Sequence, residues 1–264
     1  MSFESNTARL PSGELTYRVA GDGPPVLYFH AAGGARATAG LELLARSRCI
    51  YMPVIPGFDD TPLLESVSTM RDIARLGAEF IDGVIGEPAD VMGQSFGGWA
   101  APWLALDRPD AVGLMVLECP AGFRPEGHPP PSSDPELRLK QMFAYPARRP
   151  PETRSEATLV RNREMLHRYH GAETRDAALI DRLGEIEALT LILLGTKDGR
   201  MPRESVQLLK DRLTRAFLVY VYDAAHSIET DQPERFANLV EDFLERGETF
   251  LVNQAGVPAI SATA

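Results

Sequence analysis

A serine stands in a glycine-bounded turn, Gly93-Gln94-Ser95-Phe96-Gly97. The turn follows a short apolar run that ends at Met92 and precedes a helical pattern that begins near Ser95. A nucleophilic serine on a sharp strand-to-helix turn needs small neighbours two residues away on each side, and Gly93 and Gly97 meet that need. The N-terminus of a helix also favours developing negative charge. The pattern predicts that Ser95 is a nucleophile; the alternative is a glycine-rich turn with an incidental serine. A phosphate-binding loop is disfavoured, because its lysine and its glycine spacing are missing.

Ser95 needs a base, because a serine hydroxyl is a weak nucleophile at neutral pH. The base must lie within hydrogen-bond reach, and a third group must orient it. The chain has five histidines. They are His30, His128, His167, His170 and His226. The residue types alone leave the choice among them open.

Short apolar runs alternate with longer helical patterns along the chain, and these elements must hold Ser95 in place. The alternation predicts an α/β fold with a mainly parallel sheet and helices on both faces. The expected strands cover residues 25–30, 48–53, 89–92, 112–118, 189–194 and 217–222, with an antiparallel edge over 13–19. The expected helices cover residues 38–46, 68–85, 95–106, 203–213 and 231–246.

The alternation stops at Pro120. From there to about residue 187 the chain is rich in proline, arginine and helix formers, without a clear strand. So long a stretch is not a simple loop of a compact domain. We therefore expect a core formed by residues 1–120 and 188–250, a helical cap over 121–187 and an irregular tail over 251–264.

The chain resembles the α/β-hydrolase superfamily, specifically its capped members with a serine nucleophile, over about residues 13 to 246. The resemblance rests on several motifs in the same order, which are the serine turn, an aspartate loop after a later strand and a histidine loop near the end. It implies an α/β-hydrolase fold, in which helices flank a mostly parallel central sheet and a helical cap is inserted.

In this superfamily the catalytic residues follow the order serine, acid, histidine. The order implies that His226, in Asp223-Ala224-Ala225-His226-Ser227, is the base. It implies that Asp198, in a loop that follows a predicted strand, is the acid. Asp198 would hold the imidazole in the right tautomer and stabilise its charged form. Glu118, at the end of the strand after the nucleophile helix, is the alternative acid.

Acyl transfer also requires N–H donors for the oxyanion. The resemblance implies that the backbone N–H of Phe96 is one donor. The second is expected from the loop His30-Ala31-Ala32-Gly33-Gly34, which resembles the family's His-Gly-x-Gly loop, with Ala31 in place of the usual glycine. By position Ala32 supplies this donor, and Ala31 is the alternative. His30 is expected to shape the loop rather than to transfer protons.

The composition of the chain limits which kinds of molecule it is expected to bind. The formal net charge of −10 on 264 residues disfavours nucleic acid, whereas an anionic small molecule stays open because a local pocket can be basic. No apolar run approaches the roughly 20 residues that span a bilayer, and the N-terminus does not resemble a signal peptide, so we expect a cytoplasmic protein. We expect it to be a monomer or a homodimer. Cys49 and Cys119 are expected to be reduced, buried thiols. We expect no metal and no cofactor, because the cysteine spacing fits no metal site.

The expected cap is basic although the whole chain is acidic. Nine lysine and arginine residues lie between positions 136 and 175 of this segment. We expect them either to lie on solvated helix faces or to include one or two arginines that bind a substrate carboxylate. They are Arg138, Lys140, Arg148, Arg149, Arg154, Arg161, Arg163, Arg168 and Arg175.

Three functions fit these observations. The first is hydrolysis of an ester, thioester or related small acyl compound through a Ser-His-Asp triad and an acyl-enzyme. The second keeps the same residues but cleaves a carbon–carbon bond of a vinylogous diketone acid. The third is a non-catalytic small-ligand-binding protein, since fold alone does not fix function. The complete set of Ser95, Asp198 and His226 argues against the third.

Overall fold

The computed structural model of the chain describes residues 2–129, 132 and 134–250. Its eight-stranded sheet has the order β1-β2-β4-β3-β5-β6-β7-β8. The strands are β1 (Glu4–Leu10), β2 (Gly13–Ala20), β3 (Pro25–Phe29), β4 (Cys49–Pro53), β5 (Ala89–Gln94), β6 (Val112–Glu118), β7 (Thr190–Gly195) and β8 (Ala216–Val221). Strand β2 pairs antiparallel with β1 and β4, and all other pairs are parallel. The predicted fold class is confirmed.

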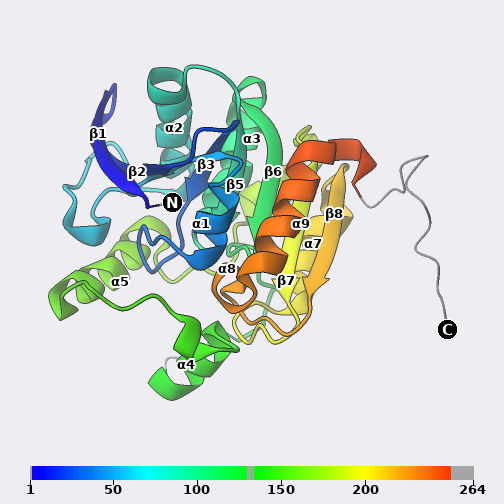
Figure 1. The fold of residues 1–264 in the computed structure, drawn as a ribbon. Helices are drawn as coiled ribbons and strands as arrows, with labels where there is room; N and C mark the ends of the chain where they lie inside the picture. The colour runs from blue at the N-terminus through cyan, green and yellow to red at the C-terminus, as the bar shows by residue number, and fades with distance from the viewer. Residues whose placement is uncertain (1, 130–131, 133, 251–264) are drawn as a thin grey trace.

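Helices cover both faces of the sheet. In Figure 1, α1 and α9 pack side by side in front of the strands, and α2 and α3 pack together behind them. The α-helices are α1 (Ala39–Leu44), α2 (Met70–Phe80), α3 (Gly97–Asp107), α4 (Pro135–Met142), α5 (Glu156–His170), α6 (Ala177–Arg182), α7 (Arg203–Arg212), α8 (Ile228–Asp231) and α9 (Pro233–Arg246). Short 3-10 or π turns are η1 (Phe58–Asp60), η2 (Ile81–Ile85), η3 (Pro109–Ala111), η4 (Pro146–Arg148), η5 (Leu183–Glu185) and η6 (Gly247–Thr249).

The sequence pattern explains the central elements. Every residue of β7 is buried, as is usual for a strand with both faces covered. Helix α3 is buried over most of its length, which fits its nearly continuous apolar sequence. Helix α2 begins at a capping box, in which Thr69 and Asp72 satisfy each other's backbone N–H groups.

One strand was not expected from the sequence. Strand β1 pairs with β2 from Glu4↔Val19 to Leu10↔Gly13. Most of its side chains are exposed. It therefore lacks the apolar alternation that marks a half-buried strand.

The segment between β6 and β7 leaves the sheet and returns to it. It contains α4, η4, α5, α6 and η5, and its extended backbone is limited to an isolated bridge between Phe123 and Arg175 in the described residues. Figure 1 shows α4 and α5 below the sheet, apart from the helices that flank it. Helix α5 packs on η1, which follows β4. The tail expected over 251–264 lies outside the described residues. Within the described part of the chain, no helix is both long and apolar enough to span a membrane.

Candidate active site

Ser95 occupies a strained turn between β5 and α3. Its φ angle is 52°, in the left-handed region that non-glycine residues rarely adopt. The flanking glycines are required by close approach, because a Cβ on Gly93 would lie 2.5 Å from the carbonyl oxygen of Gly97. A Cβ on Gly97 would collide with the carbonyl of Phe29 in β3. The turn therefore has the geometry of a nucleophile elbow.

The structure brings Ser95, His226 and Asp198 into one chain of hydrogen bonds. The Oγ atom of Ser95 lies 2.8 Å from Nε2 of His226. The Nδ1 atom of the same ring lies 2.9 Å from Oδ2 of Asp198. With the proton on Nδ1, the ring donates to the aspartate and its Nε2 accepts from the serine hydroxyl. This arrangement suits removal of the serine proton by histidine.

The environment of Asp198 keeps its carboxyl ionised. Burial alone would raise its pKa, but His226 and the backbone N–H groups of Met201 and Arg200 hold the pKa below its ordinary value. The two N–H groups donate to Oδ1 of Asp198, over 3.0 Å from Met201 and 2.7 Å from Arg200. Oδ1 is thus fixed by the backbone, and Oδ2 is left for the imidazole.

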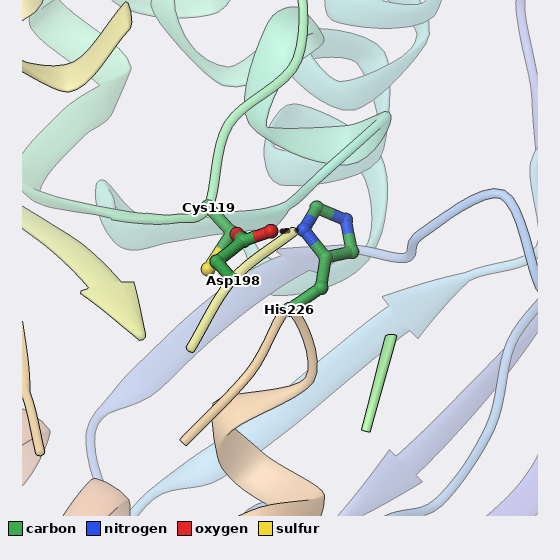
Figure 2. Close-up of side chains that lie close together, drawn as sticks. All are labelled: Cys119, Asp198 and His226. Carbon is green, nitrogen blue, oxygen red and sulfur yellow. Dashed lines mark hydrogen bonds and ion pairs between the residues drawn. The ribbon is translucent and has the colours of Figure 1, made fainter. Parts of the chain in front are cut away.

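Cys119 lies beside this pair and was not expected there. Figure 2 shows its side chain next to Asp198, with the His226 ring on the other side of the carboxylate. The three side chains are close enough to suggest a metal site. However, Asp198 already uses both oxygens, and burial, with Asp198 and Glu118 nearby, raises the pKa of the Cys119 thiol well above its ordinary value. A cysteine binds a metal as the thiolate. The three side chains therefore suit a hydrogen-bonded pair of Asp198 and His226 beside a neutral thiol better than they suit a metal site.

Glu118, the alternative acid, contacts the backbone that follows His226. Its Oε1 accepts from the N–H groups of Ile228, at 2.8 Å, and Glu229, at 3.3 Å. Burial and the neighbouring Glu229 carboxyl raise its pKa well above its ordinary value. The pKa of Glu229 is itself raised to about 7 by burial, and its carboxyl accepts from the Tyr28 hydroxyl. Glu118 therefore supports the histidine loop, and Asp198 is the carboxylate that contacts the ring.

His30 is buried and shapes the loop after β3. Its Nδ1 lies 2.7 Å from the carbonyl oxygen of Ala31, and its Nε2 accepts from the N–H of Ile55 at 3.0 Å. Burial lowers the pKa of this ring, so the imidazole is neutral. Ala31 does not need a glycine-type conformation, because its φ is not positive. The loop therefore keeps its shape with alanine at this position.

The two expected oxyanion donors flank the same cavity as Ser95. Ala32 and Phe96 both line it, and Ala31 does not. Within the described part of the chain, the N–H groups of Ala32 and Phe96 have no hydrogen-bond acceptor.

The cavity at Ser95 has a volume of about 180 Å³. Trp99, Leu166 and Met201 contribute to its apolar wall. Its polar lining includes Arg124 and Arg200. This volume is below the roughly 300–1,000 Å³ of ligand pockets in general, so the site as it stands suits a small substrate. A larger hollow of about 390 Å³, between β2 and residues 150–154, contains none of the three triad candidates.

None of the remaining histidines is hydrogen-bonded to Ser95 in the described part of the chain. His170 lines the cavity and stacks on Trp99 with ring centroids 5.3 Å apart, and burial lowers its pKa. His128 contacts Arg124, and His167 is exposed on α5.

The cavity's arginines are not those that the sequence favoured. None of the basic residues expected between 136 and 175 lines the cavity in the described structure. Arg154, for example, forms an ion pair with Asp59 at 2.7 Å. Arg124 follows β6 and Arg200 follows Asp198. Of these two, Arg200 has a signal in the sequence, its place two residues after the expected acid.

Asp231, at the end of α8, joins the histidine loop to the start of the inserted segment. Its carboxylate accepts from the N–H groups of Ala144 and Tyr145, both at 2.9 Å, and of Ala225 at 2.8 Å. The fully buried carboxylate therefore fixes the residue before His226 relative to the end of α4. Sequence reasoning missed this contact because its partners are distant in the chain.

Comparison with known proteins agrees with this geometry. The model of the Alpha/beta hydrolase family matches residues 21–239. The chain belongs to this family. It is 28% identical to a 2-hydroxymuconate semialdehyde hydrolase of Pseudomonas sp. strain CF600, over 88% of this chain and 91% of the relative. It is 30% identical to a pimeloyl-[acyl-carrier protein] methyl ester esterase of Neisseria meningitidis serogroup B, over 73% of this chain and 81% of the relative.

A solved structure shows the same fold at lower sequence identity. A serine hydrolase involved in carbazole degradation superposes with a TM-score of 0.74 at 19% identity, covering 92% of this chain and 99% of that one. The family match and the hydrolase relatives show that the protein is a hydrolase of the α/β-hydrolase superfamily. The alternative of a non-catalytic binding protein is set aside.

Proposed function

We propose that the protein hydrolyses an ester, thioester or related small acyl compound through a triad of Ser95, His226 and Asp198. The observation that carries the proposal is the continuous chain of hydrogen bonds from the serine hydroxyl through the imidazole to the buried carboxylate. The cavity opens at Ser95. The nucleophile is thus accessible to a small molecule while its two partners are buried.

Each residue has a defined task in this reaction. The Oγ atom of Ser95 attacks the substrate carbonyl carbon as Nε2 of His226 takes its proton. The carbonyl oxygen becomes an oxyanion, which accepts from the N–H groups of Phe96 and Ala32. His226 then gives the proton to the leaving group as the carbonyl–heteroatom bond breaks. Asp198 stabilises the imidazolium in both steps.

Water completes the cycle. It attacks the acyl-enzyme while His226 takes one of its protons. The tetrahedral intermediate collapses, the bond to Oγ breaks, and His226 returns the proton to Ser95. The products are a carboxylic acid and the free enzyme, so the cycle needs no oxidant, reductant or further reactant.

A second reaction class has support of its own. The 2-hydroxymuconate semialdehyde hydrolase resembles this chain over most of both sequences, and two arginines line the cavity. Carbon–carbon hydrolysis of a vinylogous diketone acid would use the same three residues, with a stabilised carbanion as the leaving group. Ester hydrolysis is preferred because it asks for nothing beyond the triad and the two N–H donors.

The test is turnover of a matched panel of substrates. p-Nitrophenyl esters and acyl thioesters with two to eight acyl carbons are compared with a ring-opened 2-hydroxy-6-oxodienoate, for the wild type and for Ser95→Ala. The proposal expects ester or thioester turnover that is strongest for short chains and is lost in Ser95→Ala. Turnover of the dienoate alone would replace it with the second class. Equal ester turnover by wild type and Ser95→Ala would refute the triad.

A further inference from the structure

Two arginines, Arg124 and Arg200, line the cavity at Ser95. Arg124 lies in the loop after β6, and Arg200 lies in the loop between β7 and α7. The two residues touch, because Nη2 of Arg124 donates to the backbone carbonyl of Arg200. The cationic wall therefore comes from the carboxyl ends of β6 and β7, whereas aromatic lining comes from the start of α3.

Arg200 has an unused donor. Its Nη1 atom is buried and has no hydrogen-bond partner among the residues that the structure describes. A buried donor left unsatisfied is destabilising, and more so when the group is charged. Arg124, in contrast, has its Nη groups occupied, since Nη1 also donates to the carbonyl of Pro129 at 2.9 Å. Arg124 thus holds the backbone of Arg200 in place, while the Arg200 guanidinium group has no hydrogen-bond partner among the described residues.

The charges around this donor do not balance. Burial lowers the pKa of both guanidinium groups from their ordinary values, and the positive charges of Arg138 and then of Arg124 lower the pKa of Arg200 further, although an arginine remains charged at neutral pH. Asp198 is the nearby buried acid, but its oxygens are used by His226 and by the backbone. Glu173 lines the cavity from an exposed position. Exposed Arg138 adds further positive potential at Arg200.

We infer that the cavity is built for an anionic substrate, whose carboxylate accepts from the guanidinium group of Arg200 while Arg124 fixes the Arg200 loop and adds positive charge. The inference rests on the proposed function and names its substrate class, a short acyl compound that carries a carboxylate. Planar guanidinium groups suit a carboxylate through charge-assisted hydrogen bonds. Because Arg200 follows the triad acid by two residues, such an anchor is rigidly linked to the catalytic residues.

The test compares substrates that differ in one carboxylate. p-Nitrophenyl hemiglutarate, which carries the carboxylate on its acyl group, is paired with the neutral p-nitrophenyl pentanoate. 4-Carboxyphenyl butanoate, which carries the carboxylate on its leaving group, is paired with the neutral phenyl butanoate. The variants are Arg200→Gln, Arg200→Lys and, as the matched control, Arg163→Gln, which removes an exposed cap arginine outside the cavity.

The expected result is a wild-type preference for the carboxylate member of one pair. Arg200→Gln is expected to lower kcat/KM for that member by 10- to 100-fold more than for the neutral member, mainly through KM. Arg200→Lys restores part of the loss, and Arg163→Gln changes neither. The pair that shows the effect identifies which part of the substrate carries the charge.

Two results would overturn the inference. One is a wild-type enzyme that turns over neutral esters with no preference for a carboxylate in either pair; this leaves the proposed function intact. The other is a parallel loss for charged and neutral members in Arg200→Gln. If no ester is turned over, the proposed function fails, and calorimetry with glutarate then decides the subsite. Binding that Arg200→Gln abolishes supports it, and absence of binding to the wild type refutes it.

Discussion

Replacing Asp198 by asparagine tests the geometry of the triad. The backbone N–H groups of Arg200 and Met201 donate to Oδ1 of Asp198, so the asparagine must place its carbonyl oxygen there. Its NH₂ group then faces Nδ1 of His226, where Oδ2 now lies at 2.9 Å. Two donors cannot face each other, so Nδ1 must lose its proton and Nε2 must carry it. In that tautomer Nε2 cannot accept the proton of Ser95.

The expected loss in kcat/KM is about 10⁴-fold, or about 5 kcal/mol of transition-state stabilisation. The matched control is Glu118→Gln. Glu118 accepts from two backbone N–H groups, and burial raises its pKa well above the ordinary value, so glutamine keeps both the shape of the side chain and its accepting oxygen. We expect Glu118→Gln to lose less than about tenfold. Initial rates on a short p-nitrophenyl ester, with circular dichroism to verify folding, measure both.

The reasoning fails if Asp198→Asn keeps activity within about tenfold of the wild type. It fails equally if Glu118→Gln loses as much as Asp198→Asn, because the contact with the His226 ring would then not distinguish the two carboxyls.

Three further predictions address the nucleophile, the buried acids and the serine turn. Ser95→Ala should lower kcat by roughly 10⁴–10⁶-fold with an unchanged melting temperature; a loss under tenfold would contradict it. Since burial raises the pKa of Glu229 from 4.5 to about 7, the unfolded chain ionises first, and wild-type stability should fall as pH rises from about 4.5 to 7. Glu229→Gln should therefore gain up to about 3 kcal/mol relative to wild type between pH 5 and pH 8 in urea unfolding; exposed Glu245→Gln should not, and equal pH profiles for the two would refute the assignment. Gly97→Ala should cost about 1–3 kcal/mol, because its Cβ would meet a β3 carbonyl. Gly184→Ala, whose nearest contact would be an ordinary 3.7 Å, should stay within about 0.5 kcal/mol; similar losses in both would show that the turn tolerates a side chain.

The fold was predictable because the buried elements carry strong local signals. Strands such as β6 and β7 are continuous apolar runs, and α2 combines a helical period with a cap at Thr69. Strand β1 carries no such signal, since exposed polar side chains dominate it and its pairing with β2 defines it. A surface edge strand has no apolar face for the sequence to reveal.

The candidate site was predictable where the chemistry requires a residue type at a fixed point of the chain. Ser95 is marked by its glycines, and Asp198 and His226 by their order after it. The supporting contacts were not, because they depend on three-dimensional packing. Cys119 meets Asp198, and Glu118 reaches the backbone after His226, only once β6, β7 and the histidine loop lie side by side.

The substrate-facing charges show the same limit. The basic composition of the inserted segment predicted that substrate-binding arginines lie within residues 136–175, whereas the arginines that line the cavity are Arg124 and Arg200. Composition reports how many arginines a segment has, but burial and missing partners report which of them are available to a ligand. Those quantities exist only in the folded chain.

Labelling with a fluorophosphonate, read by intact mass, tests the central claim most directly. An activated serine attacks the phosphorus, the P–F bond breaks and fluoride leaves, and the serine oxygen keeps the phosphonyl group, so the mass rises by one adduct. The account predicts one adduct on the wild type and none on Ser95→Ala or His226→Ala. Failure of the folded wild type to react, or equal labelling of wild type and Ser95→Ala, would contradict it.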